Sequence, residues 1–215
     1  MSGDGVDPLI LEAWLSARSI ARGLPLPVPD YGGFRVDTGS DAEVARWVFS
    51  KIGAGFKELA HSISEPHYLL KLCGAADKLR AALPKRWQLH APSYFMQGTG
   101  MPTGQRLPDG YRVEVKQLGM VLEARIFSDA GALAATGYAA EARGVFVYDR
   151  IVTEPEHRRK GLGRALMLTL HAARQQPGPE LLVATEDGRN LYSTLGWETI
   201  SPYSTASILE HNVGS

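Results

Sequence analysis

One segment near the C-terminal end constrains the fold more than any other part of this 215-residue chain. An apolar run with the pattern of a strand ends near Thr153, and a strongly apolar helical pattern begins near Leu162. Between them lie a cluster of basic residues and two glycines, Gly161 and Gly163. Several alternating strand patterns precede this segment, and another strand, helix and strand follow it, so we expect a mixed α/β sheet.

The loop between this strand and helix has the properties of an anion-binding site. At a helix N-terminus several backbone N–H groups lack an intrahelical partner, and the helix dipole adds a positive field. Glycine lets a ligand approach that backbone closely because no Cβ intervenes. The chain as a whole has 23 basic and 23 acidic residues, yet residues 156–174 hold an excess of Lys and Arg. A phosphate or pyrophosphate ligand is the expectation, and a plain structural turn with solvated charges is the alternative.

Two spaced motifs resemble those of a known family. The first is Ile151-x-Thr153-x-Pro155-x-His157-Arg158-x-x-Gly161-x-Gly163, which resembles motif A of the GNAT N-acetyltransferases. The second is Leu191-Tyr192-Ser193-Thr194-Leu195-Gly196-Trp197, which resembles that family's Leu-Tyr-x-x-x-Gly-Phe signature. The resemblance covers about residues 111–205. It implies an α/β (α+β) fold with a mixed, mostly antiparallel central sheet flanked by helices, and acetyl-CoA as co-substrate. The sequence shows no cluster of metal ligands, so we expect no metal.

The resemblance also implies roles for particular residues. The strand before motif A would splay from its neighbour, and the main chain of Ile151, Val152 and Thr153 would hold the pantetheine. A backbone N–H near Ile151 or Val152 would stabilise the oxyanion. The pyrophosphate would lie against the loop residues Arg158, Arg159, Lys160, Gly161, Leu162, Gly163 and Arg164.

Tyr192 matches the position of the family's general acid, since a phenol can donate a proton to the leaving thiolate. The alternative for Tyr192 is a buried aromatic that packs under its helix. Asp149 is the first choice for the general base, ahead of Glu141 and Glu123, although each could be an ordinary surface carboxylate.

Two positions depart from the family pattern. The family often has Asn seven residues before the tyrosine and Ala four residues before it, whereas this chain has Thr185 and Gly188. Thr185 can still form a hydrogen bond, but the pattern does not justify assigning it the Asn contact with the pantetheine.

The chain divides into residues 1–97, a Gly/Pro-rich loop at residues 98–110, and a catalytic domain at residues 111–215. The N-terminal region begins with a predicted helix between Asp7 and Gly23, followed by a Pro-rich connector. We further predict a strand at Phe34–Asp37, a helix at Ser40–Phe49 with a Ser cap, and a strand at Trp87–Met96.

Two interpretations of this N-terminal region remain open. In one, it is the start of a single acetyltransferase fold, and residues 66–110 are a long insertion. In the other, it is a degenerate copy of the C-terminal part that walls the substrate cleft and binds no coenzyme. The second rests on three parallels, each a short motif with its counterpart: Gly53-Ala54-Gly55 with Gly161-Leu162-Gly163, Leu69-Leu70 with Leu181-Leu182, and Trp87 and Pro92 with Trp197 and Pro202.

Composition limits the partners and the compartment. The single cysteine, Cys73, cannot form an internal disulfide, and no apolar run approaches the ~18 residues of a spanning helix. We therefore expect a cytoplasmic protein without a membrane or nucleic-acid partner, and a possible homodimer through a free strand after Trp197. The expected acceptor is a small-molecule amine: an amino acid, an amine metabolite, or an antibiotic or toxin. The alternatives are a non-catalytic acyl-CoA sensor and a protein N-terminal or lysine acetyltransferase.

Overall fold

In the computed structural model, which describes residues 5–100 and 107–209, the strands form one continuous sheet. Its strand order is β1-β2-β3-β4-β12-β6-β11-β10-β9-β8-β7, and β5 pairs with β12. The pairs β3–β4 and β10–β11 are parallel, and the other pairs of described strands are antiparallel. The predicted fold class, a mixed and mostly antiparallel sheet flanked by helices, is confirmed.

The elements have the following bounds. The helices are α1 (Pro8–Arg22), α2 (Ala54–Ser62), α3 (Ala76–Ala82), α4 (Leu162–Ala172) and α5 (Glu186–Ser193), with a 3-10 turn at Pro155–His157. The strands of the N-terminal part are β1 (Val28–Asp30), β2 (Gly33–Ser40), β3 (Glu43–Phe49), β4 (Tyr68–Cys73), β5 (Trp87–Leu89) and β6 (Ser93–Gly98). Those of the C-terminal part are β7 (Tyr111–Leu118), β8 (Val121–Ser128), β9 (Leu133–Ala142), β10 (Val145–Thr153), β11 (Glu180–Thr185) and β12 (Trp197–Ile208).

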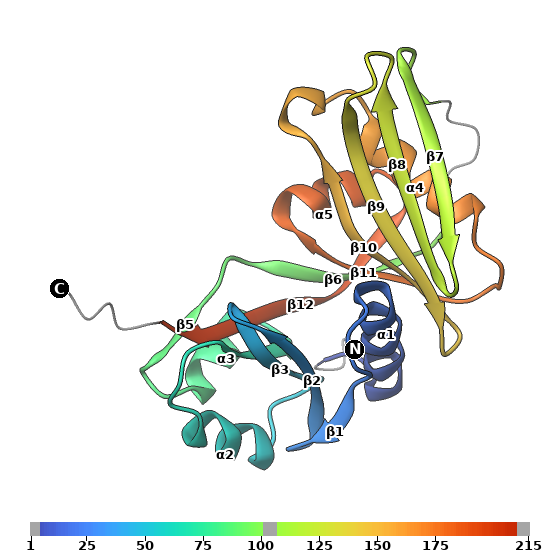
Figure 1. Cartoon of the computed structure of the whole chain (residues 1–215). Coiled ribbons are helices and arrows are strands. Elements are labelled where there is room, and N and C mark those ends of the chain that lie inside the picture. Colours follow the sequence, from blue (N-terminus) through green and yellow to red (C-terminus); the bar gives the residue numbers. More distant parts are fainter. Residues whose placement is uncertain (1–4, 101–106, 210–215) are drawn as a thin grey trace.

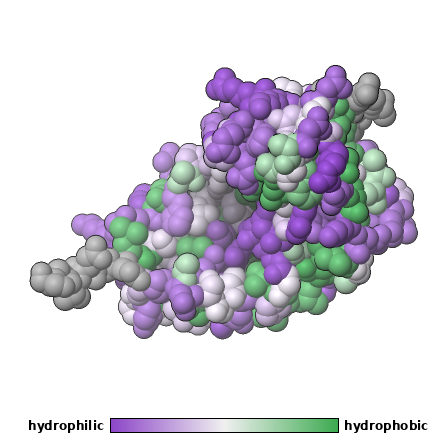
Figure 2. Space-filling view, turned by 45° about the horizontal axis from the view of Figure 1, so that its top comes forward, coloured by the Kyte–Doolittle hydropathy of each residue, from purple (hydrophilic) through white to green (hydrophobic). Residues whose placement is uncertain are grey.

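The sheet joins two lobes (Figure 1). One lobe holds β7 to β11 with α4 and α5, and the other holds β1 to β5 with α2 and α3. Strands β6 and β12 pass between the lobes, and α1 lies at the junction, where it contacts β9 and β10. The space-filling view shows a hollow in this face of the molecule, bordered largely by hydrophilic residues (Figure 2).

Helix α1 forms as its capping residues predict. Asp7 caps its N-terminus by accepting a hydrogen bond from the Leu9 amide at 2.8 Å. Gly23 ends it in the left-handed conformation, with a φ of 63°. The helix buries Trp14, whose ring packs edge-on against Phe95, so α1 is anchored to the middle of the sheet.

The predicted helix at Ser40–Phe49 is wrong, because residues 43–49 form strand β3. Ser40 does accept a hydrogen bond from the Glu43 amide, at 3.1 Å, but in the hairpin turn between β2 and β3. The capping pattern was therefore real and local, while the aromatic and β-branched residues that follow it pair with β2 and β4. The predicted strand at Trp87–Met96 is likewise divided into β5 and β6.

Residues 101–106 of the predicted boundary loop lie outside the described residues. Strand β6 ends at Gly98 and β7 begins at Tyr111, so the boundary does separate two strands. The strand after Trp197, which we expected to leave a free edge, pairs with β6 from Trp197 to Tyr203, and its second half pairs with β4 and β5. The homodimer stays an untested prediction.

The two lobes repeat one order of elements. An antiparallel strand pair is followed by a helix, a parallel strand and a second helix, in β2–β3–α2–β4–α3 and again in β9–β10–α4–β11–α5. The last strands then pair with each other: Trp197 lies opposite Gly98, and Trp87 lies opposite Ile208. The same interval separates Trp87 from Trp197 and Gly98 from Ile208, so the two strands meet about an approximate two-fold centre.

Candidate functional site

Strands β10 and β11 separate where the sequence places the splay. They pair only at Phe146 with Glu180 and at Val147 with Leu181. Beyond Val147, β10 stays paired with β9 through Val152 and Thr153. The edge of β10 that faces β11 is therefore open along its last residues, which leaves main-chain groups available to a ligand.

A β-bulge lies in β10 just before this open edge. The pairing register with β9 shifts between Asp149 and Val152. Arg150, inside the bulge, has a φ of 52°, an uncommon backbone conformation for a residue with a side chain. Its guanidinium lies 3.9 Å from the Tyr138 ring centroid and donates to the Ala21 carbonyl, which holds the bulge in place. The bulge re-aims the backbone of Ile151 relative to the rest of the strand.

The start of α4 has the geometry of an anion cradle. Gly161 precedes the helix with a φ of 79°, a left-handed conformation that other residues adopt only with strain. A Cβ at Gly163 would lie 3.0 Å from Leu191 Cδ2, so glycine also permits close packing of α4 on α5. The first-turn amides of α4 have no intrahelical acceptor, and no side chain at the Gly161 cap accepts a hydrogen bond from them.

A cavity of about 900 Å³ connects this cradle to α1. It is lined by the end of β10, the loop before α4, the first turn of α4, residues of β11 and α5, and one face of α1. The predicted site residues that line it are Asp149, Ile151, Val152, Thr153, Arg158, Arg159, Gly161, Leu162, Gly163, Arg164 and Tyr192.

Lys160 is the predicted loop residue that does not line the cavity. Its Nζ lies 6.0 Å from the ring centroid of Tyr111, whose hydroxyl hydrogen-bonds His157 Nδ1 at 3.0 Å. The loop therefore packs against β7 through these residues and presents its neighbouring arginines to the cavity.

Tyr192 lies near the end of α5 with 7% of its surface exposed. Its ring centroid is 6.2 Å from that of Trp197, and its hydroxyl forms no hydrogen bond within the part of the chain that the structure describes. Burial raises the pKa of the Tyr192 phenol to about 12. The phenol is therefore protonated at neutral pH and can act as a proton donor in the cavity that it lines.

The two departures from the family pattern fit together structurally. Thr185 caps α5 by accepting a hydrogen bond from the Gly188 amide at 3.3 Å. A Cβ at Gly188 would lie 3.2 Å from Tyr192 Cε2, closer than an ordinary contact. Gly188 thus makes room for the tyrosine ring, and Thr185 fixes the start of the helix that carries it.

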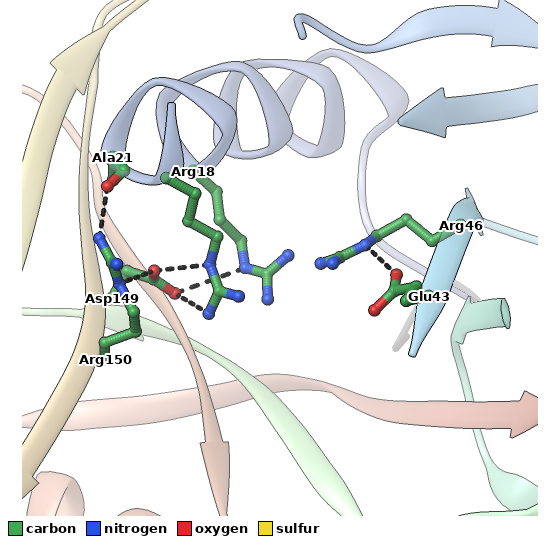
Figure 3. A network of polar contacts seen from close by, with 7 residues as sticks. Arg18, Ala21, Glu43, Arg46, Asp149 and Arg150 are labelled. Atoms are coloured by element: carbon green, nitrogen blue, oxygen red, sulfur yellow. Dashed lines mark hydrogen bonds and ion pairs between the residues drawn. The ribbon is translucent and has the colours of Figure 1, made fainter. Parts of the chain in front are cut away.

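The three candidate bases have different surroundings. Asp149 is 7% exposed and lines the cavity, and it accepts two hydrogen bonds from Arg22, at 2.7 and 2.8 Å (Figure 3). Glu123 accepts from Tyr138 and Arg125, and these hydrogen bonds outweigh burial and lower the pKa of its carboxyl group. Glu141 accepts from two backbone amides, and neither it nor Glu123 lines the cavity.

The three cavity-lining residues of α1 were absent from the predicted site. Trp14, Arg18 and Arg22 recur every fourth residue of α1 and so share one face of the helix. This spacing was visible in the sequence, and it could have indicated that the face is reserved for something other than a purely apolar core.

Comparisons with known proteins agree with this geometry. Residues 120–199 match the family model described as "Acetyltransferase (GNAT) domain". No curated protein matches the sequence significantly. A GCN5-related N-acetyltransferase from Kribbella flavida is similar in structure, with a TM-score of 0.66 and 16% identity over 98% of both chains.

Two further solved structures share the fold. A putative GNAT acetyltransferase from Novosphingobium aromaticivorans has a TM-score of 0.55 and 17% identity, covering 94% of this chain and 97% of its own. A tandem GNAT protein from the clavulanic acid biosynthesis pathway has a TM-score of 0.50 and 14% identity, covering 80% and 78%. Residues 120–199 thus match a GNAT acetyltransferase domain, and the chain as a whole shares the fold of these solved GNAT structures.

Proposed function

We propose that this protein transfers the acetyl group of acetyl-CoA to the primary amine of a small molecule. The observation that carries the proposal is the cavity of about 900 Å³, which joins the anion cradle and the open edge of β10 to a separate end against α1. A coenzyme at the cradle and an acceptor at α1 would then meet beside Tyr192.

The residues of the cradle fit the coenzyme. The free amides at the start of α4, with the arginines at positions 158, 159 and 164, would hold the pyrophosphate. The open main chain of Ile151 to Thr153 would hold the pantetheine. Acetyl-CoA supplies the thioester that the amine attacks, and a backbone N–H near Ile151 or Val152 would stabilise the developing oxyanion.

Two side chains would carry the proton transfers of this reaction. As the N–C bond forms and the C–S bond breaks, Tyr192 would donate its phenolic proton to the leaving sulfur. Asp149 remains the first choice for accepting the amine proton, directly or through water, because its carboxylate lines the cavity. Its two hydrogen bonds with Arg22 would keep it in one orientation.

The experiment is a thiol-release assay with purified protein, acetyl-CoA and a panel of amines, run in parallel with Tyr192→Phe. We expect release of CoA that depends on the amine and is lost in the variant, while acetyl-CoA binding measured by calorimetry is unchanged. Binding of acetyl-CoA without release for any amine would favour the sensor or a protein acceptor. Absence of acetyl-CoA binding would overturn the proposal.

We also propose that residues 1–97 are a degenerate copy of the catalytic part. The repeated order of elements, the start of α2 directly after Gly53, and the start of α4 directly after Gly161 support this over a single fold with an insertion. The copy would serve as the wall of the acceptor site. The single cysteine, Cys73, supports a reducing compartment, and we propose the cytoplasm.

A further inference from the structure

The end of the cavity that lies against α1 is lined by basic side chains. Arg18 and Arg22 face it from α1, and Arg150 faces it from the bulge of β10. Asp149 is the acidic residue beside them, and its carboxylate accepts hydrogen bonds from Arg22 and, at 3.1 Å, from Arg150. One carboxylate is thus shared among several guanidinium groups.

Two further basic residues, from β3 and β4, lie near these arginines. Arg46 of β3 is 5% exposed and forms an ion pair with Glu43 at 2.5 Å. Figure 3 shows its side chain reaching from β3 toward the arginines of α1, with Asp149 on the far side of them. Lys71 of β4 lies 3.4 Å from Thr205 Oγ1 and couples electrostatically to Arg46 and Arg18.

The cations of this cluster are not neutralised by their own carboxylates. Five basic groups, Arg18, Arg22, Arg46, Lys71 and Arg150, share two acidic ones, Glu43 and Asp149. Burial, together with Arg22 and Arg46, lowers the pKa of Arg18 to about 10, and burial, together with Arg46 and Arg18, lowers that of Lys71 to about 7. An anion bound here would relieve this repulsion.

Arg18 is the residue of this cluster whose guanidinium is best placed to donate hydrogen bonds to a ligand. Its Nε lies 3.5 Å from Asp149 Oδ1, and its guanidinium stacks over the Trp14 ring, 5.4 Å from the centroid. Within the described residues it donates no hydrogen bond, although 19% of its side chain is exposed and it lines the cavity. A guanidinium that lies over a tryptophan and donates no hydrogen bond among the described residues is suited to a bidentate contact with a carboxylate.

We infer that the acceptor carries a carboxylate besides its amine, and that Arg18 binds this carboxylate at the α1 end of the cavity. The inference rests on the proposed function. It favours amino-acid-like acceptors over polyamines and polycationic antibiotics, which would add positive charge to a cluster already in excess. The same cluster disfavours the ammonium form of the acceptor and so favours the neutral amine that attacks the thioester.

The test compares acceptors in matched pairs, each an amino acid and its carboxamide, across aliphatic, aromatic and acidic side chains. Rates are compared per neutral amine, because amidation lowers the amine pKa. We expect the acid to have the higher kcat/KM by about 10- to 100-fold, the range for a hydrogen bond to a charged group. Arg18→Gln should remove most of this preference by raising KM for the acid.

Arg35→Gln is the matched control, because Arg35 also stacks over a tryptophan, 5.2 Å from the Trp47 centroid, but is exposed on β2 and does not line the cavity. It should keep the wild-type preference. Equal rates for acid and amide, or a preference that survives Arg18→Gln, would overturn the inference while leaving the acetyltransferase proposal intact.

The two proposals can also fail separately in the other direction. If no member of the panel is acetylated, the small-molecule function fails, and the pairs are then tested for binding to the protein saturated with unacetylated CoA. Tighter binding of the acid than the amide, lost in Arg18→Gln, would uphold the carboxylate site. Equal binding of both would overturn it.

Discussion

The two lobes share one order of elements but differ at the place where a coenzyme could enter. In the C-terminal lobe β10 and β11 are paired at two positions and then diverge, whereas in the N-terminal lobe β3 and β4 are paired from Ala45 with Tyr68 to Phe49 with Leu72. A strand pair that stays closed uses its main-chain groups internally, so it has none to offer a pantetheine. The comparison shows that the open sheet edge, rather than the order of elements, is what distinguishes the lobe with the cavity.

The helix starts differ in the same direction. Helix α4 begins after Gly161 in a left-handed conformation, with arginines just before it, whereas α2 begins after Gly53, which has an extended φ of −132°. On the proposed repeat, the position equivalent to Arg158 is Ser50. On that repeat the N-terminal lobe would keep a glycine and a helix, but not the left-handed turn and the arginines that we propose bind an anion.

The largest expected effect is on catalysis, and it compares Tyr192 with a tyrosine of the other lobe. Tyr192→Phe should lower kcat by about 10²- to 10⁴-fold, the usual contribution of a general acid, because the leaving thiolate would lose its proposed proton donor. Acetyl-CoA affinity should stay within error, since the ring remains. Tyr68→Phe, a half-buried tyrosine on β4 of the other lobe, is the control and should leave kcat unchanged.

The second prediction compares the two helix starts directly. Gly161→Ala should weaken acetyl-CoA binding by roughly tenfold, because a left-handed alanine costs about 1–2 kcal/mol and the loop will relax away from its binding shape. Gly53→Ala should have no effect on binding, since its φ is negative and nothing lies within 4 Å of the new Cβ. Calorimetric titration of both variants measures the difference, and equal losses would contradict it.

The third prediction concerns stability at the junction of the lobes. On the proposed repeat Lys71 corresponds to Val183, and burial lowers the pKa of Lys71 to about 7. Below pH 7 the lysine is charged in both states, and the folded state carries the full cost. As the pH rises toward the unfolded value, wild-type stability should increase.

Lys71→Val should therefore raise the Tm most at pH 6 and least at pH 9, each kcal/mol corresponding to roughly 2–4 °C. Differential scanning calorimetry at these two pH values measures it. A gain that is the same at both would show that the lysine keeps an ordinary pKa in the folded protein.

The smallest expected effect sharpens the role of the α5 start. Gly188→Ala places a Cβ 3.2 Å from Tyr192 Cε2, so the ring must shift by a few tenths of an ångström. We expect kcat to fall several-fold, less than the ~10² that a full ångström of misplacement costs, and Tm to rise slightly because alanine favours helix. Unchanged kcat with a higher Tm would mean that catalysis tolerates this shift of the Tyr192 ring.

Short sequence motifs determined several local features of this structure. The Asp7 cap, the Pro8 start and the Gly23 stop specify α1, and the loop from Pro155 to Gly163 specifies the cradle before α4, because capping and left-handed turns depend on residues only a few positions apart. The motifs on either side of β11 indicated the family and the position of Tyr192 for the same reason.

Only the tertiary structure decided the rest. Ser40 forms its predicted hydrogen bond with the Glu43 amide, yet the chain continues as a strand because β2 and β4 supply pairing partners from elsewhere. Strands β6 and β12 pair with each other although they lie far apart in sequence. The same is true of Arg18, which forms an ion pair with Asp149 and lies close enough to Arg46 to interact with it electrostatically. Such contacts form when distant segments of the chain pack together during folding, and no short stretch of sequence encodes them.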